Sequence, residues 1–340
     1  MHTYPGKSAA CLICVVALAV TGCSAGSGGT ADAAPPTTSR AEASPSESAS
    51  SGTSYAPYVS ATEASAQDSA GSPSTYNLAF VISDGSDCTP KWNGTTALSD
   101  SAVKSRTSKL TQDGATVRVS FGGASGKELA ASCDSASELA QAYGEALDAA
   151  GSSQADFDIE GDELSDSDSV DLRSEAIALL QKEREVEVSF TLPVMPSGLD
   201  DDSVALLESA NEHDVQVSTV NIMTMNYGES YGDDMGDYAI TSAKAAHSQL
   251  KEVFGTSDAT AWKALALTSM LGTNDVDNET FTLDDAAQVR EFADEKGIGW
   301  VSMWATFRDQ QCGADSDDDE LTNCSGVDQE SGAFAEAFSG

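Results

Sequence analysis

The sequence predicts an α/β protein built as a closed (β/α)8 barrel, the TIM barrel, and three observations lead to this prediction. Short apolar runs with β-branched or aromatic residues recur along the chain, as buried parallel strands require. Helical patterns fall between most of these runs. Eight such strands over roughly 285 residues match the size of one barrel. A doubly wound open sheet is the alternative, but the first strand–helix turn lacks the glycine fingerprint that binds phosphate.

The candidate strands are short and are separated by polar or helical segments. They cover residues 55–61, 76–82, 116–121, 155–160, 187–193, 219–225, 263–270 and 299–304. The segment after the first strand is short and polar, so we expect the first helix of the barrel to be degenerate.

The helical patterns carry apolar residues three or four positions apart and are bounded by capping signals. The positions that form these apolar stripes are Leu139, Tyr143, Leu147, Ile177, Leu180, Val289 and Phe292. Gly151 is a candidate C-cap, and a second helix is expected from about Ser169. Thr282 and Asp285 have the spacing of a capping box, and Gly297 is expected to end that helix before the last strand.

The N-terminus has the features of an export signal. Lys7 precedes an apolar stretch at residues 9–20, which is too short to span a bilayer. The stretch ends in Val20-Thr21-Gly22-Cys23, which resembles a bacterial lipobox. We therefore expect residues 1–22 to be a lipoprotein signal peptide and Cys23 to be acylated. An ordinary signal peptide with an incidental cysteine is the alternative.

Two further regions follow the signal. Residues 23–53 are rich in Ser, Ala, Gly, Thr and Pro and cannot bury a core, so they are predicted to form a flexible tether. The composition changes near Tyr55, and residues 54–340 are predicted to form the catalytic domain. The protein is therefore expected to be exported and anchored by lipid to the bacterial cell surface, with release as a possible later step.

The cysteines fit an exported protein. Cys11 and Cys14 would leave with the signal, and the remaining four after Cys23 suggest two disulfides. These four are Cys88, Cys133, Cys312 and Cys324. Proximity favours pairing Cys312 with Cys324, and hence Cys88 with Cys133, although the sequence alone permits three connectivities.

The formal net charge of −38 argues against nucleic acid and anionic lipid surfaces as partners, but not against a neutral polysaccharide. The three histidines, His2, His213 and His247, are scattered, so no metal site is predicted and no cofactor is expected. The acidic segment 315–320 lacks the glycine and spacing of an EF-hand and is predicted to be a solvated loop.

The run 155–161 carries the strongest functional signal. Side chains of a strand alternate between its faces, so Asp156, Asp158 and Glu160 should share one face, with Phe157 and Ile159 on the other. Buried acids are costly unless they are hydrogen-bonded or functional. Burial and like charge raise the pKa of a carboxyl, as a proton donor needs, and the three acids should titrate as a coupled set in which Asp156 shares a proton with Asp158.

Polar and glycine residues also follow other predicted strands, at the barrel end where active sites lie. They are Ser120, Gly122 and Gly123 after the third strand, Met223, Met225, Asn226 and Tyr227 after the sixth, and Trp304 after the eighth. This arrangement resembles glycoside hydrolase family 18, the chitinases and related endo-β-N-acetylglucosaminidases. The Ser-x-Gly-Gly motif followed by Asp-x-Asp-x-Glu on the next strand is the most specific part of the resemblance, which covers about residues 55–340.

The resemblance implies a role for each residue. Glu160 would be the general acid, and Asp158 would orient the acetamido group of the substrate, whose carbonyl is the nucleophile in this family. Tyr227 would hydrogen-bond the same carbonyl, and Trp304 would form the apolar floor under the reacting sugar. Substrate contacts are expected from Ser120, Gly122, Gly123, Met223, Met225 and Asn226.

Two positions depart from the family pattern. Ser153 stands where an Asp often begins the acidic motif, which would shorten the proton relay. Asn226 stands where close relatives often carry Asp, and it has no charge to place near the positively charged intermediate.

The sequence thus predicts a retaining, chitinase-type hydrolase of β-1,4-linked N-acetylglucosamine polymers, acting as a monomer on chitin or chito-oligosaccharides. Two alternatives remain open: an endo-β-N-acetylglucosaminidase on N-glycans, and a non-catalytic carbohydrate-binding relative.

Overall fold

The computed structural model describes residues 52–313 and 322–340. The predicted signal peptide, Cys23, nearly all of the predicted tether and the acidic segment 315–320 lie outside the described residues. Within the described ranges, no helix is both long and apolar enough to cross a bilayer.

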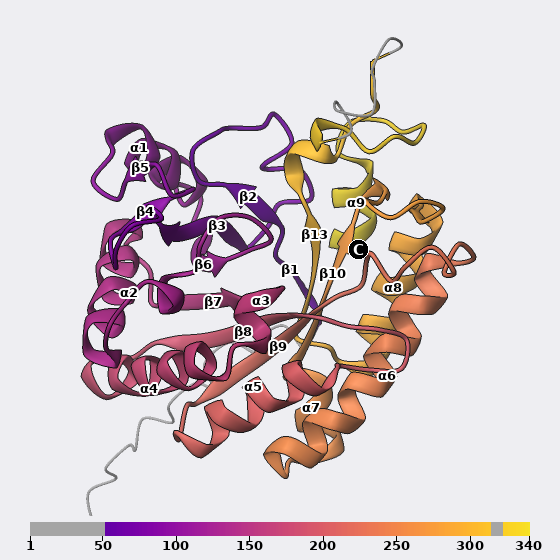
Figure 1. Ribbon diagram of the computed structural model, residues 1–340. Helices are drawn as coiled ribbons and strands as arrows, with labels where there is room; N and C mark the ends of the chain where they lie inside the picture. The colour runs from indigo at the N-terminus through magenta and orange to yellow at the C-terminus, as the bar shows by residue number, and fades with distance from the viewer. Residues whose placement is uncertain (1–51, 314–321) are drawn as a thin grey trace, which may run out of the picture. The chain divides into compact units, whose positions relative to one another are not determined.

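Parallel strands form a closed barrel, which confirms the predicted fold (Figure 1). The barrel strands are β1 (Ser54–Tyr55), β2 (Tyr58–Ser60), β3 (Thr75–Ser83), β6 (Thr116–Gly122), β7 (Gln154–Asp158), β8 (Glu187–Pro193), β9 (Val217–Met223), β10 (Leu265–Met270) and β13 (Trp300–Trp304). The predicted first strand is split, because β1 pairs with β13 whereas β2 pairs with β3. These two pieces, separated by Ala56 and Pro57, close the barrel.

Four short strands were not predicted. The first two, β4 (Pro90–Trp92) and β5 (Thr96–Ala97), extend the sheet from β3 in antiparallel fashion. The other two, β11 (Gly272–Thr273) and β12 (Thr280–Phe281), pair with each other above β10. Strands of two or three residues are too short to show the alternation by which a strand is recognised.

Helices cover the outside of the barrel in Figure 1. They are α1 (Ser101–Leu110), α2 (Ala136–Ala150), α3 (Asp162–Ser165), α4 (Ser167–Glu183), α5 (Asp201–Glu212), α6 (Met235–Phe254), α7 (Asp258–Lys263), α8 (Leu283–Lys296) and α9 (Ala333–Ser339), with 3-10 turns η1 (Leu129–Ala131) and η2 (Thr306–Arg308). Gly151 and Gly297 are left-handed C-caps, and Thr282 and Asp285 form the predicted capping box. The loop 61–74 contains no helix, as expected of a degenerate first helix.

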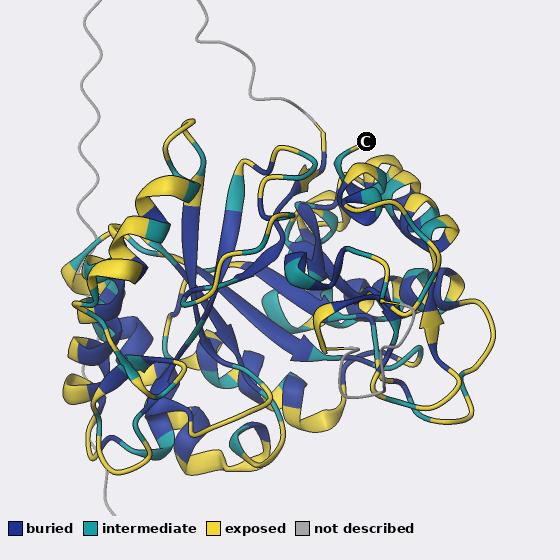
Figure 2. Cartoon of the chain, turned by 90° about the horizontal axis from the view of Figure 1, so that it is seen from above, coloured by how far each residue is buried: buried dark blue, intermediate teal, exposed yellow. Residues whose placement is uncertain are grey.

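Buried residues gather where the helices face the strands and inside the barrel, while the outer helix faces are exposed (Figure 2). The last helix, α9, packs on the first strand, since Phe338 stacks on Tyr55 with ring centroids 6.4 Å apart. Asp309 caps α9 by accepting hydrogen bonds from the backbone N–H groups of Phe334 and Ala335. The two ends of the described domain therefore meet at the seam of the barrel.

Both disulfides are those that the sequence favoured. Cys88 is joined to Cys133, and Cys312 is joined to Cys324. The first links the segment before β4 to the loop between β6 and α2, and the second spans 12 residues near the C-terminus. Each restricts the unfolded chain and so stabilises the fold.

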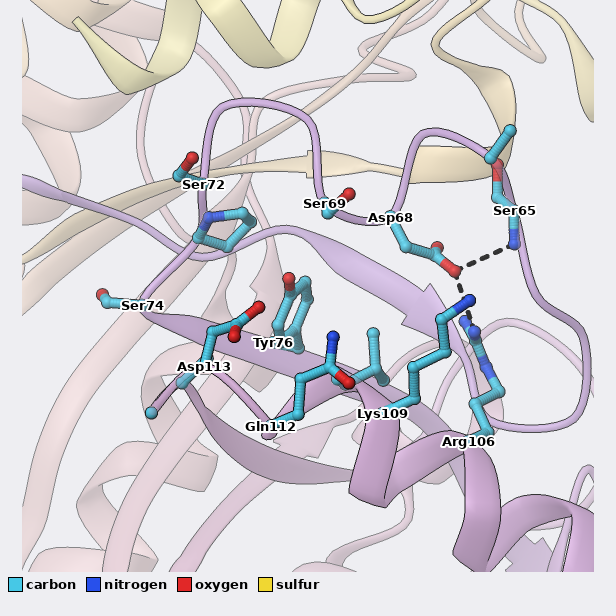
Figure 3. Close-up of a pocket in the computed structure, with 15 residues that line it drawn as sticks. Ser65, Asp68, Ser69, Ser72, Ser74, Tyr76, Arg106, Lys109, Gln112 and Asp113 are labelled. Atoms are coloured by element: carbon cyan, nitrogen blue, oxygen red, sulfur yellow. Dashed lines mark hydrogen bonds and ion pairs between the residues drawn. The ribbon is translucent and has the colours of Figure 1, made fainter.

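A nearly buried ion pair ties the loop 61–74 to α1 (Figure 3). The Asp68 carboxylate accepts from the Arg106 guanidinium at 2.8 Å, from the Ser65 N–H at 2.9 Å and from the Thr306 hydroxyl at 2.7 Å. The two charged side chains are only 9% and 10% exposed, so each charge is stabilised mainly by the other and little by water.

Replacing Asp68 by Ala should lower the free energy of unfolding by about 3 kcal/mol, because the Arg106 charge would be left buried without a partner. Chemical denaturation monitored by tryptophan fluorescence measures this change. Asp113→Asn is the matched control, since Asp113 lines the same pocket but is exposed. Equal stabilities of Asp68→Ala and Asp113→Asn would contradict the assigned role of the ion pair.

Candidate active site

The acids of the run 155–161 enter the barrel from β7. The paired registers place Asp156 between Ser120 of β6 and Ser189 of β8, and Asp158 between Gly122 and Thr191. Phe157 points outward, where it packs against Phe121, Tyr143 and Phe190. The predicted alternation is therefore confirmed for these residues. The strand itself ends at Asp158, two residues earlier than predicted, and the run turns at Gly161 into α3.

Asp156 is fully buried and is held by hydroxyl groups. It accepts hydrogen bonds from Tyr58 at 2.9 Å, Ser120 at 2.6 Å, and Ser189 and Thr191 at 2.8 Å each. All four donors are hydroxyl groups on other strands. The predicted sharing of a proton between Asp156 and Asp158 stays a prediction. Ser120, fully buried beneath the pocket, likewise serves Asp156 and is not available to a substrate.

Asp158 and Glu160 form a pair in which each carboxyl group influences the pKa of the other. Burial raises the pKa of Asp158 well above its usual range, and the charges of Glu160 and Asp156 add to the effect. Burial also raises the pKa of Glu160, against a smaller opposing effect of the hydrogen bond to Asp158. A proton shared between the two carboxyls allows one charge to stay buried there, whereas two adjacent charges would be costly.

A pocket opens above these acids, inside the ring formed by the carboxyl ends of the strands. Its lining residues are Tyr58, Phe80, Ala124, Asp158, Glu160, Thr191, Met223, Met225, Asn226, Thr268, Met270, Asp275 and Trp304. Two adjacent pockets also include Glu160, one along the residues that follow β8 and β9 and the other along those that follow β6 and β7. Glu160 thus lies where three hollows meet, which is a suitable place for a proton donor to a bond inside a polymer.

Aromatic rings form one wall of the pocket. Trp304 is half-buried and stacks on Phe80, with centroids 5.5 Å apart and an interplanar angle of 24°. Tyr58 meets the Trp304 ring edge-on at 5.8 Å. The peptide bonds Ala79–Phe80 and Trp304–Ala305 are both cis. An exposed part of a large apolar ring beside two carboxyls suits the apolar face of a sugar.

The two predicted glycines are needed for close packing. A Cβ at Gly122 would lie 2.1 Å from the Asp158 carbonyl oxygen, and one at Gly123 would lie 2.7 Å from the Phe80 ring. Both residues have φ near +90°, which also favours glycine. Gly123 lines a hollow beside Glu160, whereas Gly122 lets β6 approach β7 at Asp158.

Three of the four side chains predicted at the end of β9 line the pocket. Met223, Met225 and Asn226 line both the central pocket and one of its neighbours. Asn226 also meets Asp275 from the loop after β10: its Oδ1 accepts from the Asp275 N–H at 3.1 Å, and its Nδ2 lies 3.4 Å from Asp275 Oδ2.

Tyr227 does not join this group, so the predicted contact with a substrate carbonyl is corrected. It is 4% exposed, its ring packs between Tyr231 and Tyr238, and its hydroxyl lies 3.4 Å from the Ser242 hydroxyl of α6. Beyond Met223, where β9 ends, the alternation of faces no longer holds, and Tyr227 points into a tyrosine cluster under α6.

Seven lining residues were missed, among them Tyr58, Phe80, Thr191 and Asp275. The first three lie in predicted strands. Because side chains of a strand alternate between its faces, an even spacing from other inward residues could have identified them. Asp275 lies in a loop, where the sequence has no periodic pattern. Among residues 52–313 and 322–340, no cluster of three or more His, Cys, Asp or Glu residues could hold a metal ion.

A larger pocket of ≈ 550 Å³ lies elsewhere, between the loop 61–74 and α1 (Figure 3). Its lining includes Asp68 and Arg106, which bond to each other, and Tyr76 at the start of β3. It contains none of the strand-end acids. We therefore place the chemistry in the smaller pocket, where the two carboxyls with raised pKa values lie.

No protein-family model matches this chain. Among curated proteins, it is 34% identical over 275 residues to the probable bifunctional chitinase/lysozyme of Escherichia coli (strain K12), and 33% identical over 275 residues to endochitinase 11 of Metarhizium anisopliae. Each alignment covers 75% of this chain, but only 31% and 52% of the respective relative. The chain therefore spans about a third and about half of the lengths of these two proteins.

Among solved structures, the chain resembles the catalytic domain of a chitinase from Pyrococcus furiosus, with a TM-score of 0.73 and 29% identity over 84% of this chain and 93% of that one. Catalytic-site mutants of that domain have been solved with chito-oligosaccharides. A GH18 chitinase from Pseudoalteromonas aurantia, with a TM-score of 0.53 and 12% identity, shares the fold. The chain is thus homologous to chitinase-type glycoside hydrolases.

Proposed function

We infer that this chain is a chitinase-type glycoside hydrolase of family 18, which cleaves β-1,4-linked N-acetylglucosamine polymers with retention. The observation that carries the inference is the pair of carboxyl groups, Asp158 and Glu160, that line one pocket at the mouth of the barrel and have raised pKa values. The homology to chitinases and the sequence motif support the same reaction.

Glu160 acts as the general acid. A proton donor must be protonated before the bond breaks, and the raised pKa of Glu160 provides that form at a pH where an ordinary glutamate would be ionised. Its position at the junction of three hollows gives it access to a glycosidic oxygen between two bound sugars.

Asp158 orients the acetamido group of the substrate. Its Oδ1 is buried and has no hydrogen-bond partner, so it is an acceptor that a substrate N–H could satisfy. When the acetamido carbonyl attacks the anomeric carbon, the ring that forms carries positive charge. The carboxylate of Asp158 stabilises that charge.

One alternative is an endo-acting enzyme on glycoprotein N-glycans, which would use the same pocket and mechanism. A second is a carbohydrate-binding protein without turnover. The raised pKa values of Asp158 and Glu160 favour an enzyme, because a protein that only binds a sugar does not need a protonated carboxyl group.

The test is hydrolysis of graded N-acetylated chito-oligosaccharides by the purified domain, with proton NMR of the first product to read its anomeric configuration. We expect cleavage with the β-anomer formed first. A glycoprotein assayed in parallel separates chitinase from N-glycan activity. Binding without hydrolysis between pH 4 and 8 would refute the enzymatic assignment.

The location is part of the proposal and is supported by the sequence of residues 1–53 alone. We expect Cys23 to carry the lipid that anchors the protein to the cell surface. Labelling of growing bacteria with a radioactive fatty acid should mark the full-length protein and not Cys23→Ser. Equal labelling of the two proteins would refute the anchor.

A further inference from the structure

The cleft around Glu160 is lined by acids. Its three adjoining pockets contain the carboxyl groups of Glu128, Asp158, Glu160, Asp162, Glu163, Asp200 and Asp275. In the described part of the chain, no Lys, Arg or His lines any of these pockets. The potential in the cleft is therefore negative, and the charge of a sugar should affect how well it binds.

Several of these carboxyls already have partners. Glu128 pairs with Arg173 at 2.9 Å and accepts from the Tyr143 hydroxyl at 3.0 Å. Asp200 caps α5 by accepting from the Ser203 N–H. Asp275 differs from them, because it is exposed at the rim of the central pocket, where the charge of Arg308 acts on it without a salt bridge between the two.

The backbone around Asp275 is held firmly in place. Its own N–H donates to Asn226, and the Asn274 side chain donates to the carbonyls of Met270 and Gly272. Glu279, which ends the same loop, accepts from the Gly228 N–H at 2.7 Å. These bonds tie the loop after β10 to the loop after β9, so the carboxylate of Asp275 is positioned before a ligand arrives.

Asp275 also lies beside the uncharged side chain of Asn226, since Asp275 Oδ2 lies 3.4 Å from the Asn226 Nδ2. The negative charge at this wall of the pocket therefore comes from the loop between β11 and β12, at the rim.

We propose that Asp275 is a specificity-determining residue that binds the protonated amine of a glucosamine unit, so that the enzyme prefers partly deacetylated chito-oligosaccharides to fully acetylated ones. The proposal rests on the proposed function and names its substrate class. An ammonium group supplies three donors to a carboxylate, and charge-assisted hydrogen bonds are stronger than neutral ones. The reacting sugar keeps its acetamido group, and the free amine belongs to the sugar next to it.

The experiment compares kcat/KM for chitohexaose with that for a partly deacetylated hexamer, in the wild-type protein and in Asp275→Asn. We expect the preference for the deacetylated hexamer to fall about fivefold in the variant, as is typical of an exposed charge pair, and to weaken in the wild type as salt is raised. Glu291→Gln, an exposed acid on α8, removes the same charge far from the pocket and should keep the preference. An unchanged preference in Asp275→Asn would overturn the proposal.

Calorimetry can measure binding of the same two hexamers to Glu160→Gln and to the double variant that also carries Asp275→Asn. This readout needs no turnover. A charge preference that depends on Asp275 without hydrolysis by the wild type would support the specificity and refute the proposed function. Hydrolysis by the wild type without such a preference would support the proposed function and refute the specificity. Equal binding of both hexamers would overturn the specificity directly.

Discussion

Glu160→Gln should lower kcat/KM for chito-oligosaccharides by about 10³-fold, since general acid catalysis contributes roughly that factor and glutamine has no proton to give. Glutamine keeps the size of the side chain and its place where the three hollows meet. Binding of the oligosaccharide should therefore change little, and kcat should carry the loss. Hydrolysis of a fluorogenic chito-oligosaccharide measures both constants.

The same variant should be more stable than the wild type near neutral pH. The native state holds a proton on the pair of Asp158 and Glu160, whose pKa values are raised, whereas the unfolded chain releases its carboxyl protons near pH 4. The wild type therefore loses stability as the pH rises from the unfolded pKa to the raised one. Glu160→Gln removes the part of this loss that Glu160 causes, so the difference in Tm should grow with pH over that interval.

The control is Glu175→Gln, an exposed acid on α4, which should retain both wild-type activity and the wild-type dependence of Tm on pH. Turnover by Glu160→Gln within tenfold of the wild type would show that another group donates the proton. A difference in Tm that stays constant with pH would show that the pair holds no extra proton.

Asp158→Asn should lower kcat by about 10²-fold and shift the alkaline limb of the pH profile to higher pH. The first effect follows from the loss of the charge that faces the positively charged intermediate. The second follows because Asp158 lowers the pKa of Glu160, so its replacement leaves the rise caused by burial unopposed. The profile of kcat/KM from pH 4 to 9 reports this limb.

Asp202→Asn, at an exposed position of α5, provides the charge-matched control and should keep the wild-type profile. If the alkaline limb of Asp158→Asn coincided with that of the wild type, the two carboxyls would titrate independently. The activating role of Asp158 would then have to come from its hydrogen bonds alone.

The barrel could be predicted from sequence because its strands carry strong local signals. Phe157 alternates with Asp156 and Asp158, and this period of two is enough to place the acids inside. The caps at Gly151 and Thr282 were predictable for the same reason, since each depends on residues within one turn. The split at Pro57 was not predictable, because it depends on pairing with strands far along the chain.

The partners of the acids were harder to predict. Tyr58 has the same local pattern as an ordinary core residue, and its bond to Asp156 joins positions 98 residues apart. The four hydroxyl partners of Asp156 were not predicted, because they lie on other strands, far from Asp156 in the sequence. Tyr227 and Asp275 both lie beyond strand ends, where direction is set by tertiary packing.

The seam of the barrel has a consequence for biogenesis. Tyr55 has Val301 as its strand neighbour and Phe338 as its stacking partner, so β1 cannot pair until β13 has been made. A nascent chain that ends before β13 would display an unpaired strand edge. The order of synthesis thus makes closure of the barrel a late step of folding.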